Sequence, residues 1–214
     1  MLASVTTNIQ KTPPITWSLS AGDVLFEQDA PSATLYVVKQ GVLKGEVTTG
    51  AGKTLTLDLY GEGDLVGLAA LAGGVHLERA VALSACRLEI VHPYRGFGGA
   101  EFRQLYADAL GRQLRRAQEK LLSTTLPADA RLCAMFLELG RRFGHEQEGR
   151  VILSLPLTHD DVAGLIHTSR PTASAAIGKL RERGALEDGL GMGVFLLHPA
   201  RLEQALDECV LGTL

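Results

Sequence analysis

Residues Leu157–Leu180 read LTHDDVAGLIHTSRPTASAAIGKL and predict two short helices joined by a tight turn. The hydroxyl of Thr158 can accept a hydrogen bond from a free amide of the first helical turn, so Thr158 is the predicted start of the first helix. Ser169 can cap the second helix in the same way. Pro171 then falls in the first turn of that helix, where its missing N–H does little harm. The pair His167-Thr168 forms the predicted turn between the helices.

The two helices have a buried face and an exposed face with different chemistry. Apolar residues at helical spacing should face the core, namely Val162, Ala163, Leu165, Ile166, Ala173, Ala176, Ile177 and Leu180. The other side of the second helix carries Arg170, Thr172, Ser174 and Ala175. No acidic residue occurs between Val162 and Arg181, whereas Arg170, Lys179 and Arg181 are basic. Such a helix can lie in the major groove of DNA and contact base edges. The alternative is an ordinary helical hairpin in a small core.

The segments on either side of the helix pair favour the DNA-binding interpretation. Arg150–Leu155 reads as a short strand. Leu190–Leu197 reads as part of a hairpin, with glycines at 189, 191 and 193 around its turn. A strand, a helix-turn-helix and a hairpin together predict a winged helix, and its wing would touch the DNA backbone.

Composition sets limits on the function of the whole chain. Its 214 residues are 46% hydrophobic, which suits one large domain or two smaller ones. The formal net charge is −3, and residues 151–214 hold five Lys or Arg against eight Asp or Glu. The overall balance therefore argues mildly against DNA binding, and only the local basic patch argues for it.

Cysteine usage and hydropathy point to a cytoplasmic protein. The three cysteines, Cys86, Cys133 and Cys209, lie far apart in apolar settings and lack the spacing of a zinc or iron–sulfur site. We expect them to be core thiols in a reducing cytoplasm. The N-terminus does not resemble a signal peptide, and no apolar run reaches the roughly 18 residues that suggest a membrane span.

The N-terminal half predicts an antiparallel β-structure. Between about Ser18 and His92, short strands alternate with glycine-containing turns, at Val24–Phe26, Leu35–Val38, Val42–Thr48, Thr54–Leu59, Leu65–Gly67 and Ala80–Val91. This pattern is typical of a small barrel or jelly roll. We predict no catalytic residue and no metal site, because the chain lacks HxH, GxSxG, P-loop and HExxH motifs.

A long helix is predicted between the two halves, over Ala100–Ser123. Apolar residues spaced three and four apart form a coiled-coil seam along it, made of Ala107, Leu110, Leu114, Ala117 and Leu121. We predict that this seam pairs with a second copy of the chain; packing on the barrel is the alternative. Pro127 ends the helix, and a new one is expected over Ala130–Phe143. The predicted divisions are a sensor-type β-roll over 1–99, the dimerisation helix and hinge over 100–126, and the winged helix over 127–214.

The order of these parts resembles the Crp/Fnr family of bacterial transcription regulators. The resemblance rests on GDVLFEQDAPSATLYVVKQGVLK (22–44), YGEGDLVG (60–67), the long helix and LTHDDVAGLIHTSRPTASAAIGKLRERGALE (157–187). It implies an α+β fold with an N-terminal β-roll, a dimerisation helix and a C-terminal winged helix. It also implies a homodimer on a two-fold symmetric site in double-stranded DNA, usually an activator that contacts RNA polymerase.

The resemblance assigns DNA-reading roles. Ser169 and Arg170 match the family's Ser-Arg pattern, and the guanidinium of Arg170 would bind a guanine through two hydrogen bonds. Pro171 stands where the family has an acidic reader, and Ala175 where it often has an arginine. The operator should therefore differ from that of the catabolite activator. The predicted DNA-binding residues are Thr158, His159, Ser169, Arg170, Thr172, Ser174 and Lys179.

The region that would hold an effector departs further from the family. Members that bind cyclic nucleotides carry Gly-Glu at the phosphate-binding turn and Arg-Ser about ten residues later. Here the turn is Gly67-Leu68, and Arg79 is followed by alanine. Residues near Arg116-Ala117-Gln118 replace the Thr-Ser pair that meets adenine across the dimer. Any effector pocket would involve Gly67, Leu68 and Arg79, and we predict no tight binding of cyclic AMP.

Other sensing modes have little support in the sequence. The N-terminus lacks the cysteine cluster of oxygen-sensing members, so no cofactor is predicted. Haem sensing would rest on His76 alone, and a lone histidine is more often structural. The competing function is a ligand-binding or protein-interaction module whose helix-turn-helix no longer reads DNA. The acidic balance of residues 151–214 motivates that alternative.

Overall fold

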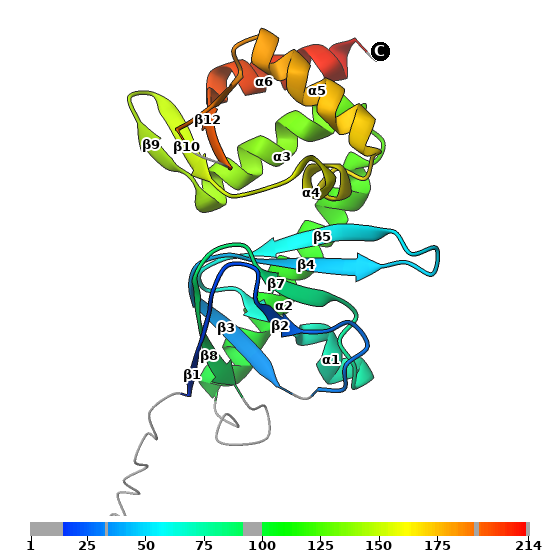
Figure 1. Cartoon of the computed structure of the whole chain (residues 1–214), viewed down its shortest axis with the longest axis vertical. Helices are drawn as coiled ribbons and strands as arrows, with labels where there is room; N and C mark the ends of the chain where they lie inside the picture. The colour runs from blue at the N-terminus through cyan, green and yellow to red at the C-terminus, as the bar shows by residue number, and fades with distance from the viewer. Residues whose placement is uncertain (1–14, 33, 92–99, 191–192, 213–214) are drawn as a thin grey trace, which may run out of the picture.

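The computed structural model describes residues 15–32, 34–91, 100–190 and 193–212 (Figure 1). A β-roll and a helical domain are joined by one long helix, α2 (Ala100–Ser123). The described strands of the roll are β1 (Thr16–Leu19), β2 (Val24–Phe26), β3 (Leu35–Gln40), β4 (Leu43–Thr48), β5 (Thr54–Tyr60), β6 (Leu65–Val66), β7 (Arg79–Ala82) and β8 (Cys86–Val91). They form two antiparallel sheets, ordered β1-β8-β3-β6 and β2-β7-β4-β5.

The roll encloses an apolar core because side chains on its strands alternate between the interior and solvent. Val38, Leu43 and Leu88 are fully buried between the sheets. The strand region predicted over Ala80–Val91 divides into β7 and β8, which lie in different sheets. A short helix that was not predicted, α1 (Leu68–Gly73), begins directly after Gly67.

Helix α2 has the predicted bounds, and α3 (Ala128–Phe143) begins two residues before the predicted start. One side of α2 lies against the roll. Ala109 on that side is buried next to Leu35 and Leu65, and Leu105 packs beside it. None of the described helices is long and apolar enough to cross a membrane.

The C-terminal domain is a winged helix, as predicted. After α3 come β9 (His145–Gln147), β10 (Arg150–Ser154), α4 (His159–Leu165), α5 (Arg170–Glu182), β11 (Leu186–Asp188), β12 (Val194–Leu197) and α6 (Pro199–Leu211). The strands form one antiparallel sheet ordered β11-β12-β10-β9. Strands β11 and β12 form the wing; Gly191 at its turn lies outside the described residues. Every residue predicted to face inward on α4 and α5 is buried.

Candidate DNA-binding site

Side-chain caps define the starts of both helices of the helix-turn-helix. The Thr158 hydroxyl accepts from the amide of Asp161 at 3.1 Å, and the Asp161 carboxylate accepts from the amide of Thr158 at 2.9 Å. This reciprocal pair is a capping box. Ser169 caps α5 by accepting from the amide of Thr172 at 3.3 Å. Between the helices, His167 adopts a positive φ of 50°, which makes the turn tight.

The N-terminal ends of α4 and α5 bring six of the seven predicted DNA-binding residues together. Ser169, Arg170 and Thr172 are exposed. His159 Nδ1 lies 2.8 Å from the Ser174 hydroxyl, so these two half-buried side chains connect α4 with α5. The remaining residue, Lys179, lies further along α5 and pairs with Asp129 of α3 at 2.7 Å.

Two of the basic residues pair with carboxylates that lie outside residues 162–181, the stretch without acidic residues. Arg170 Nη1 lies 3.3 Å from Asp160, and both side chains are 66% exposed. The hydrogen bond from Lys179 to Asp129 raises the pKa of Lys179, so this amine stays charged. Exposed ion pairs are weak and exchange readily with solvent, so both cations remain available to an anionic partner.

The side of the helix-turn-helix away from this face contacts the roll. Asp161 of α4 is buried, and its carboxylate accepts from Lys44 of β4 and from the Thr56 hydroxyl of β5, both at 2.8 Å. The sequence indicates no role for Lys44 in contacting the helix-turn-helix. Lys44 and Asp161 lie 117 positions apart, so no local pattern indicates the pair.

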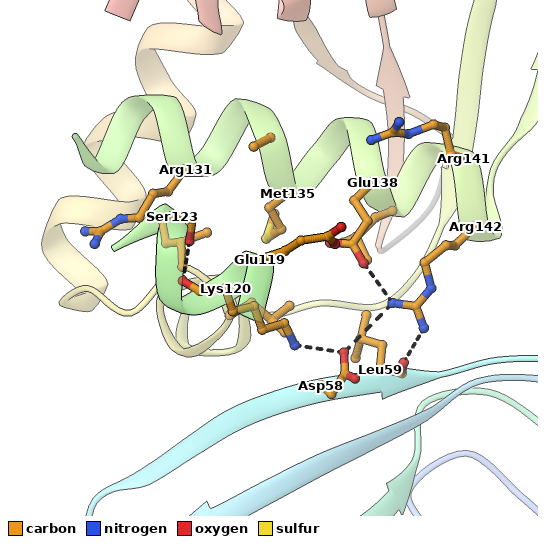
Figure 2. Close-up of a pocket in the computed structure, with 14 residues that line it drawn as sticks. Asp58, Leu59, Glu119, Lys120, Ser123, Arg131, Met135, Glu138, Arg141 and Arg142 are labelled. Atoms are coloured by element: carbon orange, nitrogen blue, oxygen red, sulfur yellow. Dashed lines mark hydrogen bonds and ion pairs between the residues drawn. The ribbon is translucent and has the colours of Figure 1, made fainter. Parts of the chain in front are cut away.

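Helix α3 makes a second contact with the roll, shown in Figure 2. Arg142 donates to the Leu59 carbonyl at 2.6 Å and to Asp64 at 3.2 Å. Lys120 of α2 donates to Asp58 at 2.8 Å, which brings the long helix into the same contact (Figure 2). A cleft of about 230 Å³, with charged and apolar walls, opens beside these pairs.

The predicted effector residues occupy the roll but do not form an open anion site. Gly67 and Leu68 are buried at the start of α1. Arg79 pairs with Glu27 at 3.0 Å and with Glu46 at 3.2 Å. Its charge is therefore already compensated by carboxylates.

Three further side chains with polar groups fill space inside the roll. The Tyr60 hydroxyl donates to Glu78 at 2.6 Å, and a β-carbon added at Gly45 would collide with the same carboxylate. Burial raises the pKa of Glu78 to about 7. His76 is buried and stacks on Phe26, with the ring centroids 3.6 Å apart, and burial lowers its pKa. Among the described residues, no group of three or more His, Cys, Asp or Glu is arranged to hold a metal.

The predicted dimer seam is exposed along α2. Leu110, Leu114 and Leu121 are 41%, 61% and 70% exposed, and the two seam alanines are also exposed. A neighbouring side of the same helix contacts the roll: Gln113 donates to the Leu65 carbonyl, and Arg116 pairs with Asp58 at 3.0 Å. Packing on the barrel therefore uses other residues than the seam.

A winged helix joined by a long helix to a roll of this type defines the class of DNA-binding transcription regulators. Two family models match the chain, the cyclic nucleotide-binding domain over residues 16–93 and the Crp-like helix-turn-helix domain over residues 130–205. The transcriptional regulator SdrP of Thermus thermophilus is 31% identical over 180 residues, covering 82% of this chain and 87% of the relative. The chain belongs to the Crp/Fnr family of transcription regulators.

Other similar proteins agree with this assignment. The fumarate and nitrate reduction regulatory protein of Escherichia coli is 26% identical over 174 residues, covering 78% of this chain and 69% of that protein. The crystal structure of a CRP/FNR-family transcriptional regulator from Thermus thermophilus superposes with a TM-score of 0.76 and 29% identity, covering 91% of this chain and all of that one. These relatives are transcription regulators and not enzymes.

Proposed function

We propose that two copies of this chain form a homodimer that binds a two-fold symmetric DNA site and activates transcription without cyclic AMP. The proposal rests on two surfaces that are both exposed on the same molecule. The reading end of α5 is open to solvent, and the apolar seam of α2 has no covering within the described chain. Pairing two seams would bury these leucines and place two reading helices in a symmetric arrangement.

Within each half-site we assign base reading to Arg170 and support to its neighbours. A guanidinium can bind guanine through two parallel hydrogen bonds. Ser169 and Thr172, with hydroxyls 2.8 Å apart beside Arg170, are suited to phosphate or base contacts. Thr158, His159, Ser174 and Lys179 complete the proposed interface, and the wing would lie along the DNA backbone.

Independence from cyclic AMP is supported by the charges inside the roll. Arg79 would have to leave the buried carboxylate of Glu46 before it could pair with a cyclic phosphate. Arg116, near the positions where the family has its adenine-binding pair, is held by Asp58 and Asp64. A buried phosphate without a free arginine would carry a penalty of several kcal/mol. One relative, from Mycobacterium tuberculosis, is named a cAMP-activated regulator, so this property would distinguish the present chain.

The activating role and the contact with RNA polymerase follow from the family resemblance, and no surface is assigned to them. A regulator of this kind would act in the cytoplasm of a bacterial cell, where its DNA target lies.

A second candidate function is a protein-interaction or ligand-binding module that no longer reads DNA. It is favoured by the carboxylates beside two of the proposed DNA contacts, Asp160 on Arg170 and Asp129 on Lys179.

Selection of binding sequences from random duplexes, with and without cyclic nucleotides, followed by titrations at two salt concentrations, separates these functions. A DNA-binding regulator should select a symmetric sequence and lose affinity as salt rises, because phosphate contacts release counterions. Binding without sequence preference, or without salt dependence, would contradict the proposal. A selected sequence that requires a cyclic nucleotide would contradict only the independence from cyclic AMP.

A further inference from the structure

We infer that Lys44 and Thr56 of the roll are positioning residues for DNA recognition, because they fix the orientation of the helix-turn-helix through Asp161. We call Lys44, Thr56, Asp161 and Gly164 the Asp161 latch. The inference rests on the proposed symmetric dimer, in which the two reading helices must keep a set distance and angle.

The Asp161 carboxylate serves two structures at once. Its Oδ2 accepts from the amide and hydroxyl of Thr158, at 2.9 and 2.7 Å, and so caps α4. Its Oδ1 accepts from the Lys44 amine and the Thr56 hydroxyl, both at 2.8 Å. Burial alone would raise the pKa of Asp161, but the hydrogen bonds from Lys44, Thr158 and Thr56 hold this pKa below its usual value. The carboxylate that completes the capping box of the first helix is therefore also anchored to the roll as a charged group.

Gly164 brings the two backbones into direct contact. A β-carbon at this position would lie 2.6 Å from the amide nitrogen of Thr56 and 3.0 Å from its carbonyl oxygen. Glycine is a poor residue for the interior of a helix, because it loses more conformational freedom than alanine on folding. Its presence in α4 is explained by this approach of α4 to β5.

A second contact prevents the domain from pivoting about the latch. Arg142 of α3 binds the Leu59 carbonyl and Asp64 in the roll, on the side of the interface shown in Figure 2. The winged helix therefore contacts the roll at two separate places, through α4 and through α3.

The latch orients the reading helix without covering it. Asp161 and Gly164 are buried against the roll, whereas Ser169, Arg170 and Thr172 are exposed. The contact therefore differs from an inhibitory one, which would hide the reading residues. When only a fraction of molecules has the binding orientation, the apparent affinity falls by that fraction. Loosening the latch should accordingly weaken DNA binding.

The test measures tolerance to the spacing of half-sites in the full-length protein. Binding is titrated with the selected symmetric duplex and with the same duplex carrying two extra central base pairs, which rotate one half-site by about 70°. Gly164→Ala adds a methyl group that collides with the backbone of Thr56. Lys44→Met and Thr56→Val remove the two donors from the roll to the Asp161 carboxylate. Gly178→Ala is the control for the first variant, because a methyl group there meets nothing within 4 Å. Lys39→Met, which breaks the pair with Glu89 on the other sheet of the roll, is the control for Lys44→Met.

The unmodified protein and both controls should lose at least about tenfold in affinity on the lengthened duplex. The latch variants should bind the original duplex about tenfold more weakly, if about a tenth of the molecules keep the orientation, and should lose threefold or less on the lengthened one. Circular dichroism verifies folding, and Gly164→Ala and Thr56→Val carry the test if Lys44→Met does not fold. Latch variants with unchanged affinity and spacing preference, or with higher affinity, would overturn the inference. An unmodified protein that ignores spacing would overturn the proposed dimer and the inference together.

Discussion

Arg170 is the side chain on which sequence recognition should depend most. It lies at the start of α5, exposed, and its partner in the free protein is Asp160 at 3.3 Å. That exposed pair orients the guanidinium at little energetic cost and can open when DNA arrives.

Replacing this side chain should therefore affect specific binding selectively. We expect Arg170→Ala to weaken binding to the selected site by about 1–3 kcal/mol and to relax the preference at one base pair in each half-site. Arg183→Ala is the matched control, since Arg183 pairs with Glu208 beyond the end of α5. Titration of single-base variants of the site measures the effect. An equal loss on all sequences would make Arg170 a phosphate contact.

Glu78 should make the stability of the roll depend on pH. Its pKa of about 7 in the folded chain lies above the ordinary glutamate value of 4.5. The folded chain then keeps a proton that the unfolded chain releases, so this residue lowers stability as the pH rises from about 4.5 to 7. Glu78→Gln should remove that loss. The variant should gain stability relative to the unmodified protein on going from pH 5 to pH 8, by at most on the order of 3 kcal/mol.

Denaturant unfolding at both pH values measures this difference. The control is Glu62→Gln, at an exposed position in the turn before β6. An equal change in stability at the two pH values in Glu78→Gln would show that Glu78 does not carry the proton.

At the scale of elements, one side of helix α2 packs on the roll and another side is exposed. Its roll-facing side uses Ala109 and polar side chains such as Gln113, Arg116 and Lys120. Its other side exposes the leucine seam.

Charges placed in the seam should separate the copies without disturbing the roll. We expect Leu114→Glu combined with Leu121→Glu to yield monomers, because four carboxylates would face one another across the pair. Sedimentation velocity measures the change. Leu77→Glu is a fair control, because Leu77 on the roll is 62% exposed against 61% for Leu114. A double variant that remains dimeric would place the interface elsewhere.

Substitution by alanine should change the stability of the chain in opposite directions at the two helical glycines of the helix-turn-helix. Gly178 of α5 has open space at its β-position, so Gly178→Ala should stabilise the chain by about 0.5–1 kcal/mol through a higher helix propensity. Gly164→Ala gains the same propensity but forces α4 away from Thr56, with an expected net destabilisation of about 1–3 kcal/mol. Thermal and denaturant unfolding of both variants measures the contrast. Two stabilising substitutions would show that α4 does not press on β5.

At the scale of the molecule, the roll is held to the winged helix by its own side chains. Asp58 and Asp64 each pair with arginines from both α2 and α3. Because these carboxylates and arginines already neutralise one another, an anionic effector would find no unpaired arginine among them.

Calorimetry with cyclic AMP checks this property on the whole protein. We expect no binding heat and no change in DNA affinity, because Arg79 and Arg116 already have carboxylate partners. A related cyclic nucleotide-binding protein, run under the same conditions, provides the positive control. Micromolar binding to this chain would refute the argument from the roll.

Local signals explain which parts were predictable. The caps at Thr158 and Ser169 predicted the starts of α4 and α5, whereas α5 continues to Glu182, two residues beyond the predicted end at Leu180. Helical periodicity predicted α2.

Non-local contacts explain what the sequence did not indicate. Strand β9 consists of three exposed polar residues and owes its conformation to pairing with β10. The contacts of Lys44 with Asp161 and of Arg142 with Asp64 join residues 117 and 78 positions apart. Their side chains look like ordinary surface charges until the chain is folded.

The approach of Gly164 to Thr56 also limits how such proteins can diversify. A winged helix that folded independently of its roll could be moved between regulators by recombination. Here a transplanted winged helix with any larger residue at position 164 would not seat on this roll, and a transplanted roll would need donors matching Lys44 and Thr56. New target sequences should therefore arise in this lineage by point changes on the exposed face of α5 rather than by exchange of the whole domain.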